Sequence, residues 1–198
     1  INTKDLIVSL QTSLTTSSID ESNPVFSPDR NRIAYSAGYT AGSYQIYVMN
    51  ANGSNQSSIT TNNTYYHWDL SWHPSSRIAF VSNKDNINGE IYTINPDGSD
   101  ERRLTYNSHY DRYPAWSPNG NKIAFGTNRD GNWEIYVMNY DGTNPVNISN
   151  SPSTHDVSPS WSPDGSKLVY ASGSSTSTQI WIMDYPSGLN KRRITSTS

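Results

Sequence analysis

The sequence contains no cysteine, which excludes disulfide bonds and thiolate metal sites. Charged residues make up only 16% of the chain and the formal net charge is −3, so nothing indicates a nucleic acid or an anionic membrane as the partner. No apolar run approaches the roughly 18 residues of a transmembrane helix, and we expect no membrane insertion. The first residue is Ile1 rather than Met, which we interpret as the mark of a processed or trimmed chain.

Phenylalanine is also scarce, with 3 residues, whereas the chain has 14 Tyr and 6 Trp. Tyrosine and tryptophan combine an apolar ring with a polar group, so they suit positions that are partly buried and partly hydrated. We therefore expect many half-exposed aromatic side chains.

One segment of about ten residues occurs four times with conservative changes. Its prolines, Pro28, Pro74, Pro118 and Pro163, stand 46, 44 and 45 residues apart. Self-similarity at a fixed period of about 20–50 residues is typical of a repeat architecture. The four copies are FSPDRNRIAY (26–35), WHPSSRIAF (72–80), WSPNGNKIAF (116–125) and WSPDGSKLVY (161–170).

Each repeat has the pattern of four short antiparallel strands. In the third repeat, runs of β-branched and aromatic residues alternate with Pro-Asn-Gly, Asp-Gly-Asn and Asp-Gly turns. Four such strands in about 45 residues form the blade of a β-propeller. The strands predicted for this repeat are 113–116, 122–125, 134–138 and 146–149.

The other repeats keep this chemistry. The third strand recurs at 45–50, 90–95 and 179–184, and the closing strand ends in Leu-Thr, Ile-Thr or Ile-Ser. A single sheet cannot bury both of its faces, so neighbouring blades must pack face to face. We expect the aromatic residue that opens each decapeptide to lie between blades: Phe26, Trp72, Trp116 and Trp161.

The succession Trp-Ser-Pro-Asp-Gly, Ile-Tyr-x-Met-Asn-x-Asp-Gly and Leu-Thr resembles the TolB-type (WD-like) β-propeller repeat, over residues 20–198. The resemblance implies an all-β, TolB-like propeller in a single domain. Relatives of this repeat include TolB, which binds the peptidoglycan-associated lipoprotein Pal, and propeller domains of prolyl-oligopeptidase-like enzymes and oligogalacturonate lyases, so the fold does not settle the function. We expect a periplasmic or secreted bacterial protein. The predicted divisions are a partial blade at 1–15 and blades at 16–60, 61–105, 106–149 and 150–198.

Two features depart from the TolB pattern. A TolB protein carries an α/β domain before its propeller, for which this sequence has no room, and its propeller is expected to have six blades. Here residues 4–15 read as the last two strands of an earlier blade, with Leu14-Thr15 as its closing pair. Open blade faces and edges are usually covered. We therefore expect either self-association into a homo-oligomer or a compact ring that uses residues 4–15. A third hypothesis is that the chain is a trimmed piece of a longer propeller.

The candidate binding surface is the face that collects the loops between blades and the loops between second and third strands. Loops on a rigid scaffold commonly carry binding residues, and this face gathers histidines, aromatic side chains and carboxylates. We expect it to bind a protein or peptide. Its candidate residues are Tyr65, Tyr66, His67, Tyr110, Asp111, Arg112, Tyr113, Trp133, His155 and Asp156.

Metal binding through histidine has little support. His67, His109 and His155 stand 5, 7 and 6 residues before the Trp of their blades, so the repeat does not bring them to one ring, and we expect them to bond to their own loops. The position five residues before the aromatic does align, and we expect its side chains to point toward the axis. They either cap their own loops or form a polar ring for Ca²⁺, Na⁺ or a partner's basic group; no other cofactor is expected. These residues are Glu21, His67, Asp111 and Asp156.

Catalysis is not predicted. The sequence has neither a Gly-x-Ser-x-Gly elbow nor a Gly-rich phosphate loop, and its Asp-Gly pairs fall where hairpins need them. The leading hypothesis is a non-catalytic binding module. The alternative is an extracytoplasmic propeller that binds or processes carbohydrate, since Tyr and Trp rings stack on sugars. A chiefly structural or self-assembling role is the third hypothesis.

Overall fold

The computed structural model describes residues 13–38, 43–61, 64–75, 77–174 and 176–195. Within them the chain forms sixteen strands in four antiparallel four-stranded sheets, each with its strands in chain order. The predicted all-β class is therefore confirmed. No helix that could cross a membrane occurs in this part of the chain.

The first sheet contains β1 (Asp20–Phe26), β2 (Arg32–Gly38), β3 (Tyr44–Asn50) and β4 (Ser57–Ser58). The second contains β5 (His67–Trp72), β6 (Ile78–Ser82), β7 (Glu90–Ile94) and β8 (Arg102–Arg103). The third contains β9 (Asp111–Trp116), β10 (Lys122–Thr127), β11 (Glu134–Asn139) and β12 (Val146–Asn147). The fourth contains β13 (His155–Trp161), β14 (Lys167–Ser174), β15 (Ser177–Asp184) and β16 (Arg192–Arg193).

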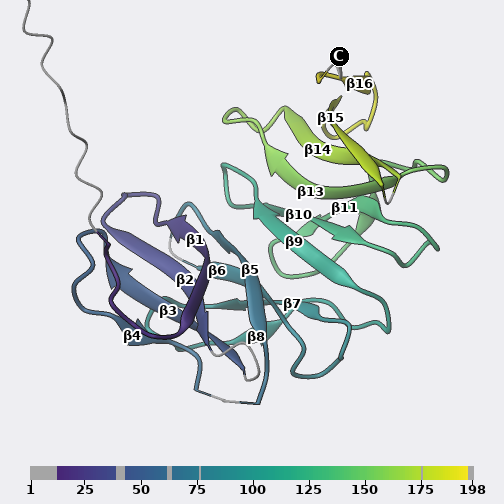
Figure 1. Cartoon of the computed structure of the whole chain (residues 1–198). Coiled ribbons are helices and arrows are strands. Elements are labelled where there is room, and N and C mark those ends of the chain that lie inside the picture. The colour runs from purple at the N-terminus through teal and green to yellow at the C-terminus, as the bar shows by residue number, and fades with distance from the viewer. Residues whose placement is uncertain (1–12, 39–42, 62–63, 76, 175, 196–198) are drawn as a thin grey trace, which may run out of the picture.

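The sheets follow one another in space as they do in the sequence (Figure 1). Their first strands make the successive contacts, β1 with β5, β5 with β9 and β9 with β13. Among the described residues, no strand of the first sheet contacts a strand of the fourth. The four sheets therefore do not close on each other, and most of the predicted remnant, residues 4–12, lies outside the described residues.

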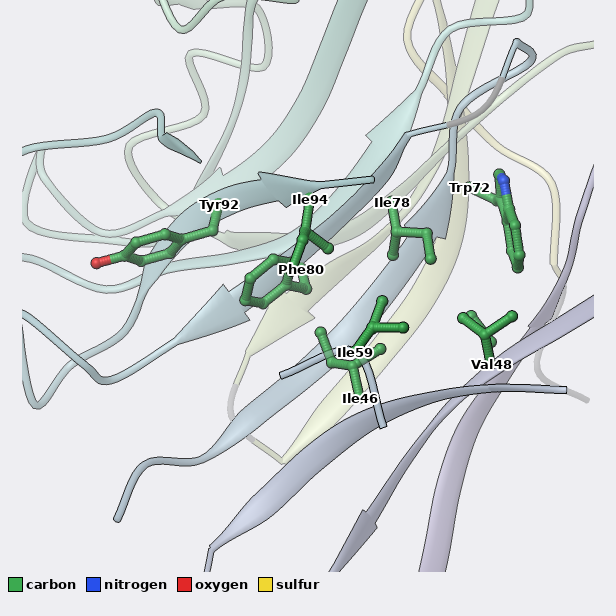
Figure 2. Close-up of a cluster of buried hydrophobic side chains, with 9 residues drawn as sticks. Ile46, Val48, Ile59, Trp72, Ile78, Phe80, Tyr92 and Ile94 are labelled. Carbon is green, nitrogen blue, oxygen red and sulfur yellow. The ribbon is translucent and has the colours of Figure 1, made fainter. Parts of the chain in front are cut away.

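Apolar side chains of each sheet pack against the next sheet. Figure 2 shows the first of these interfaces, where Ile46 and Val48 of β3 face Ile78 and Phe80 of β6. Phe80 is fully buried and stacks on Tyr92, with 5.7 Å between ring centroids. The strand alternation predicts this arrangement, because residues of one parity share a face.

The expectation for the repeated tryptophans is confirmed. Trp72 and Trp116 are buried between sheets, and Trp161 packs half-buried against the interface of the third and fourth sheets. Phe26 differs, since it is 58% exposed. The difference arises because no described sheet precedes β1–β4.

The turn that follows each third strand lies against the preceding blade. A Cβ on Gly98, whose φ is +85°, would stand 2.8 Å from the carbonyl oxygen of Ile59. Gly53 also has a φ of +85°, and a Cβ there would stand 2.6 Å from the carbonyl oxygen of Leu14. Leu14 therefore occupies the position that Ile59 occupies one blade later.

Candidate functional site

A β-bulge interrupts the first strand of every sheet at the same repeat position. The strand register shifts between Trp68 and Ser71 in β5, and the residue after Trp68 adopts a left-handed conformation, with φ of 53° at Asp69. Non-glycine residues rarely adopt positive φ, and bulges at the rims of barrels often redirect side chains. The four bulge residues, with φ of 52–56°, are Asn23, Asp69, Tyr113 and Ser158.

The bulges surround a shared opening, which we call the axial pocket. Its volume is about 270 Å³, and each sheet contributes its bulge residue and the next residue. Three of the residues that follow the bulges are prolines, which cannot donate a backbone hydrogen bond. The lining is Asn23, Pro24, Asp69, Leu70, Tyr113, Pro114, Ser158 and Pro159.

Asp69 is the carboxylate of the axial pocket. Its Oδ2 accepts a hydrogen bond from the backbone N–H of Tyr113, at 3.3 Å. Desolvation raises the pKa of Asp69, while the Tyr113 N–H and the charge of Arg112 act in the opposite direction. The carboxylate thus joins the second sheet to the third beside the pocket.

Arg112 lies between two aromatic rings next to this pocket. Its guanidinium carbon is 4.9 Å from the ring centroid of Trp68 and 5.3 Å from that of Tyr110. Trp133 extends the group, with its ring centroid 6.0 Å from Tyr110 and 6.3 Å from Tyr113. We call these five residues, Trp68, Tyr110, Arg112, Tyr113 and Trp133, the aromatic cluster.

Several predicted site residues meet here. Tyr110, Arg112, Tyr113 and Trp133 belong to the aromatic cluster, and His155 accepts the backbone N–H of Trp133 at its Nδ1, 3.3 Å away. The histidine thus holds the backbone of Trp133, directly before β11.

Tyr65 and Tyr66 lie apart from this group, between the first and second sheets. Tyr66 is 37% exposed and stacks on Tyr44, with 5.9 Å between centroids. The Tyr65 carbonyl accepts a hydrogen bond from the Gln45 side chain. These two tyrosines contact no member of the aromatic cluster through a described ring contact or hydrogen bond.

The expectation that the aligned polar residues point to the axis is wrong. His67, Asp111 and Asp156 are 2%, 0% and 0% exposed, and none of them lines the axial pocket. The bulge lies two residues further along each strand, so it is the bulge residues that face the axis. Buried side chains offer a ligand no contact area.

The aligned carboxylates instead bond to loop residues. Asp111 forms an ion pair with Arg129, with 3.0 Å between Oδ1 and Nη2, and the exposed Glu21 accepts a hydrogen bond from Ser17. Asp156 accepts a hydrogen bond from the Thr154 hydroxyl at 3.2 Å, and desolvation raises its pKa. Local loop bonding is thus what the structure shows for these carboxylates.

His67 packs edge-on against Phe80, with 5.5 Å between centroids. Desolvation lowers its pKa to about 4. The described part of the chain contains no group of three or more His, Asp or Glu side chains that could hold a metal ion.

Sequence reasoning missed the buried glutamates at the start of the third strands. Glu134 is 2% exposed and accepts the backbone N–H of Ser151 at 2.8 and 3.0 Å. Glu90 is 0% exposed and accepts the N–H of Asn107 at 3.1 Å. They anchor the loops that lead to His155 and Tyr110. The recurrence of Gln or Glu before Ile-Tyr or Ile-Trp was the available signal.

Comparison with known proteins identifies the class of fold. Residues 111–198 match the family described as the TolB beta propeller domain. The structure resembles that of a putative TolB from Agrobacterium tumefaciens, with a TM-score of 0.76 and 26% identity over 85% of this chain and 62% of that one. The resemblance to the TolB-type propeller repeat is therefore confirmed.

Other solved structures share the fold at lower identity. TolB from Acinetobacter baumannii gives a TM-score of 0.79 at 23% identity, over 93% of this chain and 46% of that one. A puromycin-hydrolyzing peptidase from Mycobacterium tuberculosis gives 0.74 at 14% identity, over 92% of this chain and 29% of that one. No curated protein matches the sequence. The chain spans less than two thirds of the length of each of these structures.

Proposed function

We propose that this propeller is a non-catalytic binding module that holds a protein or peptide partner at the aromatic cluster and the axial pocket. One observation carries the proposal: Arg112 lies against two rings of an aromatic cluster, beside a pocket that all four sheets line. Arginine, tyrosine and tryptophan are the side chains that dominate the energetics of protein interfaces.

The partial exposure of the cluster supports this use. Tyr110 is 36% exposed, and Trp68, Arg112, Tyr113 and Trp133 are half-buried. Each of these side chains therefore has exposed surface that a partner can cover, while its position is already fixed by neighbouring side chains. Such preorganisation lowers the entropic cost of binding.

The experiment selects peptides for the intact protein from a displayed library of random dodecapeptides and measures the affinity of the selected peptides. Trp133→Ala is expected to weaken binding at least about tenfold, as removal of a central aromatic contact does. The matched control is Tyr140→Ala, because Tyr140 is 59% exposed in the turn after β11, at the opposite end of the strands. Equal affinities for both variants contradict the proposed site.

A parallel titration with plant and bacterial oligosaccharides separates the carbohydrate alternative. A glycan that quenches tryptophan fluorescence in the native protein but not in Trp133→Ala would move the function to that class. We expect no such glycan.

We also propose that the chain self-associates through the free face of the fourth sheet. Positions buried in the first three sheets are uncovered there: Ile46, Ile91 and Ile135 are 0% exposed, whereas their counterpart Ile180 is 40% exposed. Ile194 is likewise 46% exposed where Ile59 is 6% exposed. The opposite end is already covered in part, because Leu14 and Thr15 lie over the outer face of the first sheet. Packing of this fourth-sheet face on the same face of a second copy gives a closed dimer.

Light scattering on a size-exclusion column tests this second proposal. One chain has a mass of 22.1 kDa, so the expected species has about twice that mass. Ile180→Lys should give the single-chain mass, whereas Ile87→Lys should not, although Ile87 is 81% exposed. A native protein that elutes as one chain at all concentrations overturns the dimer.

A further inference from the structure

We propose that Arg112 reads a carboxylate of the partner, so that the ligand of this surface is a peptide segment with an acidic side chain or a free C-terminus. This inference rests on the proposed function and specifies the chemistry that the aromatic cluster recognises. The geometry points to it through the contacts that the Arg112 side chain makes and lacks.

Two aromatic rings hold the guanidinium of Arg112, and Asp69 acts on it through charge alone. Trp68 and Tyr110 lie 4.9 and 5.3 Å from its central carbon, and stacking of this kind leaves the in-plane N–H groups free to donate. Its Nε is buried and has no hydrogen-bond partner among the described residues. No ion pair or other hydrogen bond joins its side chain to these residues either.

Neighbouring arginines at the same end of the propeller already form ion pairs with carboxylates of the chain. Arg129 pairs with Asp111 at 3.0 Å, and Arg103 pairs with Glu90 at 3.3 Å. Each of these arginines therefore has a carboxylate within ion-pair distance, whereas Arg112 forms no ion pair with a described residue. The Nη groups of Arg112 are not among the buried unpartnered atoms, so a ligand carboxylate can reach them and accept two parallel N–H···O bonds.

Asp69 does not take that role. Its Oδ2 accepts the backbone N–H of Tyr113, and it forms no ion pair with Arg112. Its negative charge beside Arg112 weakens the attraction for a second carboxylate, so direct hydrogen bonds to the guanidinium must supply the affinity. The fork of an arginine fits a carboxylate through two parallel N–H···O bonds.

The axial pocket fixes which part of the ligand lies next to the carboxylate. Leu70, Pro114 and Pro159 form apolar parts of its lining, so the adjoining ligand residue should be small or apolar. A short acidic segment with such a neighbour can thus contact the arginine and the pocket together.

Nuclear magnetic resonance on the intact ¹⁵N-labelled protein tests the inference directly. The probes are N-acetylglutamate α-methylamide, which carries a side-chain carboxylate, N-acetylalanine, which carries a terminal carboxylate, and N-acetylglutamine α-methylamide, which carries neither. We expect a carboxylate probe to shift the Arg112 Nε–Hε signal, which is assigned from its absence in Arg112→Lys. The neutral probe should leave it in place, and the more effective carboxylate identifies the source. No shift with either carboxylate overturns the inference.

Affinity measurements on the selected dodecapeptides form the second arm. Replacement of the peptide carboxylate by an amide should weaken binding to the native protein about tenfold or more, as expected for a charge-assisted bidentate contact. The same replacement should have little effect on Arg112→Gln. The matched control is Arg32→Gln, which removes a guanidinium 5.3 Å from the Trp72 ring at the opposite end of the strands and should keep the native preference.

The outcomes separate the two proposals. If peptides bind at the aromatic cluster but acid and amide forms bind Arg112→Gln and the native protein with the same ratio, the binding function stands and the role of Arg112 falls. If the small carboxylates shift Arg112 but no peptide depends on Trp133, the anion site stands and the proposed function falls.

Discussion

The backbone N–H of Tyr113 lies 3.3 Å from Oδ2 of Asp69, and these two residues occupy the same bulge position in adjacent sheets. Both have positive φ, 56° at Tyr113 and 53° at Asp69. The bulge thus does two things at once: it turns a side chain toward the axis and presents an N–H to the preceding blade. This relationship ties the shape of the axial pocket to the packing of the blades.

Substitution of Asp69 should separate conformation from charge. Asp69→Asn keeps a side-chain acceptor and a residue that tolerates positive φ, so the free energy of unfolding should stay within about 0.5 kcal/mol of the native value. Asp69→Val places a β-branched residue at φ of 53° and removes the acceptor, which should cost about 2 kcal/mol or more. Urea unfolding measures both. A valine variant as stable as the native protein would refute the structural role of the bulge.

Truncation of buried and exposed aromatic residues should distinguish blade interfaces from the free end. Phe80 is 0% exposed between the first and second sheets, so Phe80→Ala should lower the free energy of unfolding by about 3–5 kcal/mol. Phe26 is 58% exposed, and Phe26→Ala should cost less than about 1 kcal/mol. Chemical denaturation of the two variants side by side gives the comparison; similar losses would contradict the described packing.

The burial of His67 predicts a pH-dependent loss of stability. Its pKa is lowered from 6.5 to about 4, so between these values the unfolded chain binds a proton that the folded chain does not. The stabilisation is therefore complete above pH 6.5 and is lost as the pH falls through about 4, by about 3 kcal/mol in total.

The His67→Gln variant lacks this titrating imidazole. The free energy of unfolding of the variant should therefore fall less between pH 7 and pH 4 than that of the native protein. His155→Gln serves as the control, because His155 is half-buried and should leave the His67 contribution intact. Urea midpoints at several pH values provide the measurement. A native-like pH dependence in His67→Gln would show that another group is responsible.

The sequence predicted the strands well because turn-forming residues and the alternation of side chains along a strand are local features of the sequence. The third strand expected at 134–138 is found as Glu134–Asn139, and the one expected at 122–125 as Lys122–Thr127. The closing strand expected at 146–149 is shorter, Val146–Asn147. There Ser149 turns its hydroxyl to the backbone N–H of Ile135 instead.

The candidate site was predicted only in part, because bulges change the face on which a side chain lies. Simple alignment of the repeats placed Asp111 and Asp156 at the axis, but both are fully buried. Asp69 and Ser158 line the axial pocket instead. Strand alternation could not predict the contact of Arg112 with Trp68 either, because this contact joins two blades.

The measurement that tests the central claim most directly follows the six tryptophan indole N–H signals of the ¹⁵N-labelled protein while a selected dodecapeptide is added. We expect the signals of Trp133 and Trp68 to move. Those of Trp72 and Trp116, buried between sheets, and of Trp181 in the fourth sheet should stay in place. Movement of Trp181 with Trp133 and Trp68 unchanged would place binding on another surface and contradict the account.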